Sequence, residues 1–307
     1  MVTTYRDNPE LTGSREKKEM QKDSPVLHHF GEMVRSYFHG KIIKTVDLDP
    51  EEVYLFGFHP HGIMPFTCFW LRCSEEWEKL FPGVTFSTLT ASVMHLIPVM
   101  RDVLQWMGGR EVSKEAIQLA LRSKRSCLLI PGGQAEMMES RSCLDEIVLV
   151  TKHIGFIRLA MQENVKLVPV LSIGEVDLMD NVQMPKVQRW FLQRIGFAAP
   201  FSPYGVWYLP IPNPKPVSVI VGTPITVPHV AEPSLTEIYD VLYEYMCGLN
   251  SIFDANEEVC QQGLPNRTLK FLDFQGKKRE LSEFPVYLKD MACQKQAQGQ
   301  AKEGHKS

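Results

Sequence analysis

The sequence predicts an α/β domain in which helices flank a mostly parallel or mixed sheet. Apolar runs of strand length alternate with segments of helical periodicity, and this alternation is typical of a largely parallel sheet with helices on its faces. The run from Leu167 to Ile173 is almost wholly apolar, as parallel strands covered on both faces tend to be. The chain has 307 residues, of which 44% are hydrophobic, so it can supply one large core or two modest ones.

Two segments precede this domain. Residues 1–23 are dense in Lys, Glu, Arg and Asp, so we expect a disordered leader. Residues 24–46 are predicted to be an amphipathic helix and a lead-in, because Ser24-Pro25 fits a cap and a first helical position. The apolar residues of this helix follow at helical spacing: Val26, Leu27, Phe30, Met33, Val34, Tyr37 and Phe38. The stripe either packs on the domain or lies in a membrane interface.

The domain is expected to span residues 47–291, and a polar, disordered tail is predicted over 292–307. The first strand of the domain ends at His59. The elements expected after it are a helix over 66–80, a strand over 84–89, a helix over 98–107, a helix capped by Ser113, a strand over 127–130, a helix over 148–162, a strand over 167–173, a strand over 217–221 and a helix over 235–259.

Composition argues against several classes of protein. A net charge of −3 disfavours a nucleic-acid-binding protein, which is usually basic. Seven cysteines without a CxxC pair suit reduced thiols in the cytosol, and the charged N-terminus is not typical of a signal peptide. Two windows of transmembrane length, 53–71 and 195–214, lack charged residues, but prolines interrupt both, so we predict no spanning helix.

A basic and aromatic segment lies between residues 182 and 214. Lys186, Arg189 and Arg194 alternate with large apolar side chains, and Trp207 and Tyr208 follow in a proline-rich run. Basic residues beside aromatic ones suit the headgroup boundary of a bilayer. An ordinary surface helix followed by a loop explains the same pattern, so both interpretations stay open.

The most informative segment for chemistry is the apolar run from Tyr54 that ends in His59-Pro60-His61-Gly62. His59 and His61 lie two residues apart, so extended backbone would direct both to one side, and Pro60 fixes one φ angle between them. Gly62 allows the backbone to turn closely against whatever the imidazoles face. The segment therefore predicts a strand that ends in presented imidazoles.

Several segments resemble, in order and spacing, the motifs of the type-2 diacylglycerol acyltransferase family, which includes monoacylglycerol and wax-alcohol acyltransferases. Phe58-His59-Pro60-His61-Gly62 is similar to its His-Pro-His-Gly motif, and Pro131-Gly132-Gly133-Gln134-Ala135-Glu136 is similar to its Gly-Gly-x-x-Glu block. The other matching segments are Tyr37-Phe38, Gly155-Phe156 with Ala160, Leu167-Val168-Pro169-Val170, Gly174-Glu175 and Gly222-Thr223-Pro224-Ile225-Thr226. The resemblance runs from Tyr37 to Pro265 and implies a fold like that of the glycerolipid acyltransferases.

This resemblance implies a function. It predicts an acyl-CoA-dependent O-acyltransferase that makes triacylglycerol from diacylglycerol, on the cytosolic face of the endoplasmic reticulum membrane or at lipid droplets. Monoacylglycerol and wax alcohols are alternative acceptors. Acyl-CoA is the expected co-substrate and a membrane surface the expected partner; no cofactor is expected, and the oligomeric state stays open, a homo-oligomer included. A non-catalytic lipid-binding scaffold is the alternative from another class, because no aspartate follows either histidine after four residues and no membrane span precedes the motif.

The implied reaction needs a base, because the pKa of an alcohol lies far above 7, and a neutral imidazole titrating near ~6.5 suits this work. His61 is our first choice because it immediately precedes Gly62, and His59 is the alternative. Glu136 is the candidate for the carboxylate that orients the imidazole, since its strand would neighbour the histidine strand. A surface or capping role for Glu136 is the competing interpretation.

Further residues are candidates for substrate contacts besides Pro60 and Gly62. Gly132 and Gly133 would either bring backbone N–H groups to the thioester oxygen or form a plain turn. Lys152 and Arg158 would either meet the phosphates of coenzyme A or remain solvated. Glu175 either lines the site or is structural.

Three other chemistries lack their motifs. The sequence contains no Gly-x-Ser-x-Gly of a serine hydrolase and no phosphate-binding loop ending in Gly-Lys. His59 and His61 have no third zinc ligand at regular spacing, so no metal site is predicted. Direct attack of the alcohol on the thioester in a ternary complex is therefore favoured over a covalent acyl-enzyme.

Overall fold

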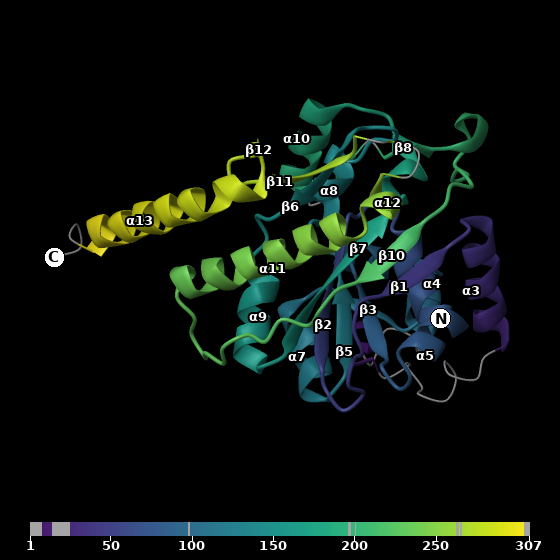
Figure 1. Cartoon of the computed structure of the whole chain (residues 1–307), viewed down its shortest axis with the longest axis horizontal. Helices are drawn as coiled ribbons and strands as arrows, with labels where there is room; N and C mark the ends of the chain where they lie inside the picture. The colour runs from purple at the N-terminus through teal and green to yellow at the C-terminus, as the bar shows by residue number, and fades with distance from the viewer. Residues whose placement is uncertain are drawn as a thin grey trace.

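The structure is a computed structural model that describes residues 8–13, 25–97, 99–195, 198–199, 201–261, 264 and 266–303. A seven-stranded sheet forms its centre, in the order β1-β10-β7-β2-β5-β3-β4 (Figure 1). Its strands are β1 (Lys41–Lys44), β2 (Tyr54–His59), β3 (Phe86–Thr90), β4 (Gly109–Glu111), β5 (Ser126–Leu129), β7 (Lys166–Ile173) and β10 (Ser218–Val221). All neighbours are parallel except β10 and β7, so the predicted mostly parallel, mixed sheet is confirmed.

Two smaller sheets extend this centre. The first has the order β12-β11-β6 and contains β6 (Glu146–Val150), β11 (Thr268–Leu272) and β12 (Lys278–Arg279). The second is the antiparallel pair β8 (Asp180–Asn181) and β9 (Pro203–Tyr204). The β8–β9 pair places Asn181 opposite Pro203.

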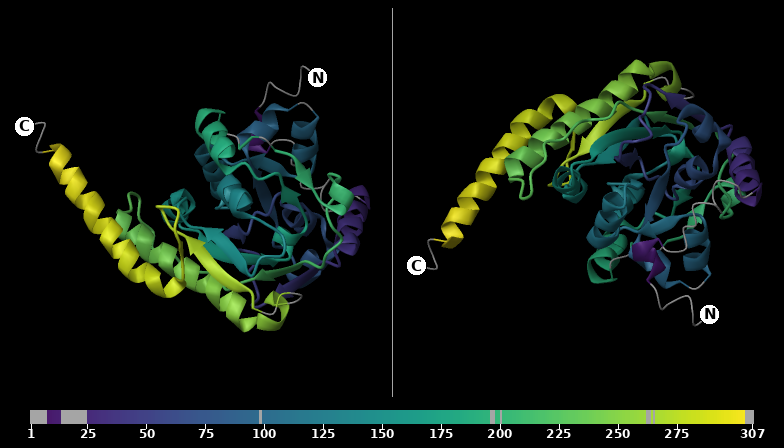
Figure 2. Two further views of the ribbon diagram at one scale, coloured as in Figure 1. Left: turned by 90° about the horizontal axis from the view of Figure 1, so that it is seen from above. Right: turned by 90° about the horizontal axis from the view of Figure 1, so that it is seen from below.

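Helices cover both faces of the central sheet (Figures 1 and 2). The α-helices are α1 (Pro9–Thr12), α3 (Pro25–Tyr37), α4 (Phe66–Cys73), α5 (Glu75–Leu80), α6 (Met100–Trp106), α7 (Lys114–Arg122), α8 (Gly133–Glu139), α9 (Gly155–Glu163), α10 (Pro185–Ile195), α11 (Leu235–Ala255), α12 (Glu257–Cys260) and α13 (Phe284–Glu303). Single 3₁₀ turns lie at Ser92–Leu96, Glu175–Asp177, Val206–Tyr208 and Leu281–Glu283. Helices α7, α9 and α11 pack on one face, whereas α4 and α5 pack on the other.

The alternation of side chains along β2 explains how one short strand serves both cores. Phe56 and Phe58 belong to the core under α4 and α5, and Leu55 belongs to the core under α11. Because successive strand residues point to opposite faces, Gly57 and His59 share the side of Leu55. On that side the hydroxyl of Tyr245, from α11, donates a hydrogen bond to the carbonyl oxygen of Gly57 at 3.0 Å.

The structure corrects several sequence-based boundaries. The helix predicted over 148–162 begins only at Gly155, because residues 146–150 form β6 and pair with β11. The helix predicted over 66–80 is two helices, since Ser74 leaves α4 and caps α5 by accepting from the N–H of Glu76. Helix α11 ends at Ala255 and the short α12 follows it, where one helix to residue 259 was predicted.

Helices lie within both of the end segments for which disorder was expected. Helix α13 continues to Glu303, through most of the expected tail, and Phe284 and Leu288 at its beginning are buried against the core around α11. Helix α1 lies inside the expected leader, and Glu10 in it pairs with Arg101 at 2.6 Å. Residues 1–7, 14–24 and 304–307, including the predicted cap at Ser24, lie outside the described residues.

The apolar stripe of α3 is divided between the interior and the surface. Leu27 and Phe38 are buried, and α3 packs against α4. Val26, Phe30, Met33 and Tyr37 remain exposed. Across the parts of the chain that the structure describes, no helix combines the length and the apolar character needed to cross a bilayer.

Replacing Gly57 with Ala should destabilise the fold. A Cβ atom there would overlap the hydroxyl oxygen of Tyr245, so α11 or β2 has to shift. We expect the free energy of unfolding in urea to fall by about 1–3 kcal/mol, the usual cost of overpacking a core. The double variant Gly57→Ala/Tyr245→Phe should recover part of this loss because it lacks that oxygen.

Gly155→Ala is the matched control for this variant. No described atom lies within 4 Å of a Cβ built on Gly155, so its unfolding midpoint should stay near that of the wild type. A wild-type midpoint for Gly57→Ala would contradict the packing described for β2 and α11.

Candidate active site

The carboxyl ends of the parallel strands gather the predicted site residues at one edge of the sheet. His59 is the last residue of β2, which lies between β5 and β7. The turn after β5 carries Gly132 and leads into α8 with Glu136, and the turn after β7 carries Glu175. Because parallel strands end at a common edge, residues distant in the sequence meet there.

A fully buried carboxylate is the centre of this group. Oε1 of Glu136 lies 2.6 Å from Nδ1 of His59, and both side chains are almost completely excluded from solvent. Oε2 of Glu136 accepts from the backbone N–H of His61 at 2.9 Å, and Oε1 also accepts from the N–H of Val150 at 2.9 Å. A carboxylate only accepts hydrogen bonds, so Nδ1 of His59 carries a proton, and in the neutral ring Nε2 carries the lone pair. Among the described atoms, this buried Nε2 has no hydrogen-bond partner.

His61 is held differently from His59. Its backbone N–H binds Glu136, whereas its ring Nδ1 lies 3.0 Å from the carbonyl oxygen of Gly62. The half-buried ring has a lowered pKa, chiefly because burial disfavours the imidazolium. Of the two histidines left open as partners of Glu136, the ring of His59 contacts its carboxylate, whereas the ring of His61 does not. Pro60, which joins the two through a cis peptide bond to His59, is buried.

Gly132 has a steric reason to be glycine. A Cβ atom there would overlap the carboxyl group of Glu136, so any larger residue would displace that carboxylate. The N–H of Gly133 donates to the carbonyl oxygen of Ile130 at 3.2 Å, and the φ angle of Gly133 is +48°. Of the two alternatives for Gly133, the structure therefore favours the plain turn over a donor to the thioester oxygen.

Glu175 supports the histidine loop from behind. Its carboxyl group accepts from the backbone N–H of Thr67 at 3.3 Å and from the hydroxyl of Ser172 at 3.1 Å. Thr67 lies in the first turn of α4, the helix that follows the loop, and the backbone of Glu175 lies directly under Gly62, whose φ angle is +63°. Burial raises the pKa of Glu175 to about 8. Its contacts make Glu175 a support of the loop.

The two predicted phosphate contacts lie on the surface of the protein. Lys152 follows β6 by two residues and Arg158 lies on α9, and both are exposed. His153, between them in sequence, lies near enough to Glu136 to feel its charge, but burial of the ring and the charge of Lys152 act against this attraction and lower its pKa. Lys152 and His153 thus lie between the surface and the buried pair of His59 and Glu136.

Sequence reasoning missed two residues of the site. The N–H of Val150 fixes one oxygen of Glu136, and the ring of Tyr245 lies 6.0 Å from the ring of His59, measured between centroids. Tyr245 lies in the helix predicted over 235–259, and the sequence assigned it no role in the site. The available signal was Gly57, because a glycine inside a buried strand indicates that another group approaches the backbone closely.

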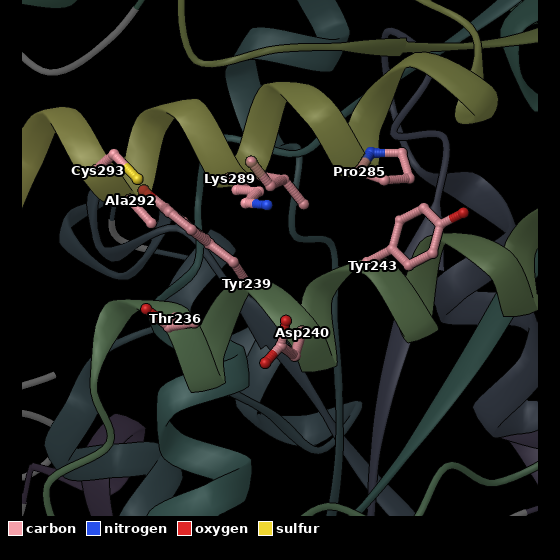
Figure 3. A pocket seen from close by; sticks show the side chains of 9 residues that line it. Thr236, Tyr239, Asp240, Tyr243, Pro285, Lys289, Ala292 and Cys293 are labelled. Carbon is pink, nitrogen blue, oxygen red and sulfur yellow. The ribbon is translucent and has the colours of Figure 1, made fainter.

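A separate cavity of about 420 Å³ lies between α11 and α13 (Figure 3). Tyr239, Asp240 and Tyr243 line it from α11, and Leu288 and Lys289 line it from α13. None of the predicted site residues lines this cavity, so it belongs to the packing of the last helix rather than to the histidine–glutamate pair.

Comparison with known proteins identifies the class of protein. Residues 4–269 match the family model described as "Diacylglycerol acyltransferase". The chain is 34% identical over 282 residues to diacylglycerol O-acyltransferase 1 of Schizosaccharomyces pombe, covering 87% of this chain and 79% of that protein. It is 33% identical over 241 residues to acyl-CoA wax alcohol acyltransferase 1 of Homo sapiens, covering 73% and 72%. The protein is an acyltransferase, and the chain belongs to the diacylglycerol acyltransferase family.

One solved structure is also similar. The 1-acyl-sn-glycerophosphate (LPA) acyltransferase PlsC from Thermotoga maritima superposes with a TM-score of 0.44 at 11% identity, over 75% of this chain and 78% of that one.

Glu175 should make stability depend on pH. Its pKa in the folded chain, about 8, exceeds the ordinary value of 4.5, so the folded state holds a proton that the unfolded state has released between these two values. The contribution of the neutral carboxyl is complete below about pH 4.5 and is lost as pH rises to about 8. Glu175→Gln keeps a neutral side chain with an acceptor oxygen, so its stability should fall less over this interval.

Urea unfolding of both proteins at about pH 5 and about pH 8.5 measures this difference. An equal loss of stability in wild type and Glu175→Gln would contradict the assignment. Glu175→Ala serves as the reference for lost hydrogen bonding. It should cost about 1–3 kcal/mol at about pH 5 because the N–H of Thr67 loses its acceptor, and less at about pH 8.5, where the wild type has itself lost the contribution of the neutral carboxyl.

Proposed function

We propose that this enzyme transfers a fatty acyl group from acyl-CoA to the hydroxyl of diacylglycerol, and so makes triacylglycerol. The names of its relatives support this choice of acceptor, since several are diacylglycerol O-acyltransferases. Acyl-CoA wax alcohol acyltransferases match at similar identity, so a long-chain alcohol is the second candidate acceptor, with monoacylglycerol beside it.

We propose His59, held by Glu136, as the general base. The observation that carries this proposal is the buried contact of 2.6 Å between Nδ1 of His59 and the carboxylate of Glu136. With the proton on Nδ1, the lone pair of Nε2 is available to accept a proton from the alcohol. His61, our first choice from sequence, is the less suitable base because its ring Nδ1 lies against the carbonyl oxygen of Gly62 and not against a carboxylate that would stabilise an imidazolium.

The proposed reaction proceeds by addition and elimination in a ternary complex. Nε2 of His59 takes the hydroxyl proton while the alcohol oxygen forms a bond to the thioester carbonyl carbon. The tetrahedral intermediate then breaks its carbon–sulfur bond, and the departing thiolate of coenzyme A takes the proton back from Nε2. The carboxylate of Glu136 stabilises the imidazolium between these steps, and His59 ends each cycle in its starting form.

The proposed substrates suggest where the enzyme works. Diacylglycerol and its product reside in membranes, so we propose that the enzyme acts at a membrane surface, on the cytosolic side of the endoplasmic reticulum or on a lipid droplet. All seven cysteines are free thiols, which suits a reducing compartment. The exposed side chains of Lys152 and Arg158 are the proposed contacts for the phosphates of coenzyme A.

Substituting the two histidines separates their roles. Membranes or detergent extracts containing the full chain are assayed with labelled acyl-CoA and an equimolar mixture of diacylglycerol, monoacylglycerol and a long-chain alcohol. His59→Ala should lower the rate roughly 10²–10⁴-fold, the usual worth of a general base. His61→Ala should lose much less because its backbone N–H still binds Glu136, and triacylglycerol should be the main product of the wild type.

Added imidazole tests whether the His59→Ala variant is folded and lacks only its general base. In that case imidazole should restore part of its activity. A loss with His61→Ala as large as that with His59→Ala would move the base to His61. A labelled wax ester as the main product would replace diacylglycerol with a long-chain alcohol as the acceptor.

A further inference from the structure

Two segments near the active site expose large aromatic and apolar side chains. The first is residues 182–195, which include α10, and the second is residues 205–212; we call them together the basic–aromatic face. Helix α10 packs inward through Gln188 and Leu192. Its outward side carries Val187 and Trp190, and the side chain of Trp190 is 54% exposed. Trp207 and Tyr208 in the second segment are 86% and 84% exposed, and Leu209 and Ile211 beside them are also exposed.

Backbone hydrogen bonds within the second segment hold its conformation. The N–H of Gly205 donates to the carbonyl oxygen of Leu209 at 2.8 Å, and the N–H of Val206 donates to that of Ile211 at 2.9 Å. Trp207 and Tyr208 have φ angles of +52° and +60°, a conformation that side-chain-bearing residues adopt at an energetic cost. The chain thus keeps two large aromatic side chains outside the protein, although burying them would be favourable.

The charged residues of the face are basic. From Asn181 to Ala231 the sequence contains four basic residues, Lys186, Arg189, Arg194 and Lys215, and no Asp or Glu. Lys186, Arg189 and Arg194 are exposed on α10, and the guanidinium of Arg194 lies over the ring of Trp190 at 5.9 Å. Cations around protruding Trp, Tyr, Leu and Ile side chains complement the anionic headgroups and the acyl boundary of a bilayer.

The face is tied directly to the catalytic elements. The N–H of Ala198, just after α10, donates to Oε1 of Gln134 at 2.8 Å, and Gln134 lies on α8 two residues before Glu136. Figure 1 shows α8, α10 and β8 together toward the upper edge of the molecule, where the strands of the sheet end. The hydroxyl of Tyr37 donates to the carbonyl oxygen of Pro212 at 2.7 Å, which joins the exposed stripe of α3 to the second segment.

We propose that the basic–aromatic face docks the enzyme on a bilayer that contains anionic phospholipids, with the edge of the sheet that carries His59 turned toward the lipid. Trp207 and Tyr208 enter the interface, and the cations of α10 contact the headgroups. The inference rests on the proposed function for its purpose, because a lipid acceptor then reaches the site from the bilayer, but the docking itself does not depend on catalysis.

Vesicle co-sedimentation of the full chain tests the docking without reference to activity. The probes are phosphatidylcholine vesicles, with and without phosphatidylserine, at low and high salt. Wild type should bind the phosphatidylserine vesicles more tightly, and salt should reduce this preference. Trp207→Ser/Tyr208→Ser should bind both kinds of vesicle at least about tenfold more weakly, because two apolar surfaces no longer leave water.

A charge variant and matched controls complete the test. Arg189→Gln/Arg194→Gln should lose about tenfold or more in affinity for phosphatidylserine vesicles and little for phosphatidylcholine alone, since each basic residue near an anionic surface adds about fivefold. Val286→Ser, an exposed apolar site on α13, and Lys114→Gln/Lys124→Gln on and after α7 should bind as the wild type does.

Activity of Trp207→Ser/Tyr208→Ser on water-soluble short-chain substrates separates docking from catalysis. Retained activity with weakened vesicle binding supports the docking proposal. A wild type that binds vesicles but transfers no acyl group would contradict the proposed function and leave the docking proposal intact. Wild-type vesicle binding by both face variants, vesicle binding that ignores phosphatidylserine, or no binding by the wild type would overturn the docking proposal.

Discussion

The carboxylate of Glu136 is the interaction on which the rest of the site depends. It joins α8 to the end of β2 through His59, to the loop directly after β2 through the N–H of His61, and to the end of β6 through the N–H of Val150. Hydrogen bonds to a charged group contribute about 1.5–3 kcal/mol each, so this one side chain fixes the loop as well as the imidazole. Its neighbour Gly132 leaves the space that it occupies.

The sequence was sufficient for the local parts of this arrangement. An apolar strand ending at His59, a turn at Gly132, and a carboxylate at Glu136 on a neighbouring strand–helix unit follow from patterns within a few residues of each other. These patterns did not indicate whether the carboxylate of Glu136 contacts the ring of His59 or that of His61. His59 is still paired with Leu171 in the sheet, whereas His61 lies beyond the strand end, where the backbone turns at Gly62. The assumption of extended backbone through both histidines therefore failed.

Long-range pairing explains the other errors. Residues 146–150 were assigned in part to a helix because their partner strand, β11, lies more than a hundred residues later, with Val150 opposite Leu272. Disorder was expected over residues 292–307 because they are polar, and α13, whose first turns bury Phe284 and Leu288 against the core, continues into them. Tyr245 was predicted only as part of a helix, because the packing of α11 on β2, which brings its hydroxyl to Gly57, cannot be inferred from neighbouring residues. These features depend on contacts that local periodicity does not encode.

The proposed mechanism and the proposed membrane surface fit one arrangement of the molecule. The buried pair lies at the carboxyl edge of the sheet, Glu175 holds the loop from the interior, and the segment after α10 contacts the helix of Glu136. An acceptor arriving from a bilayer and acyl-CoA arriving from water would then meet at the same edge.

The most direct test of the central claim is the protonation of the His59 ring, measured by long-range ¹H–¹⁵N NMR on protein labelled at histidine. If Glu136 fixes this ring, neutral His59 carries its proton on Nδ1 and leaves Nε2 unprotonated, and Glu136→Gln shifts the balance between the two tautomers while His61 changes little. A proton on Nε2 of His59 in the wild type, or spectra that Glu136→Gln leaves unchanged, would contradict the account.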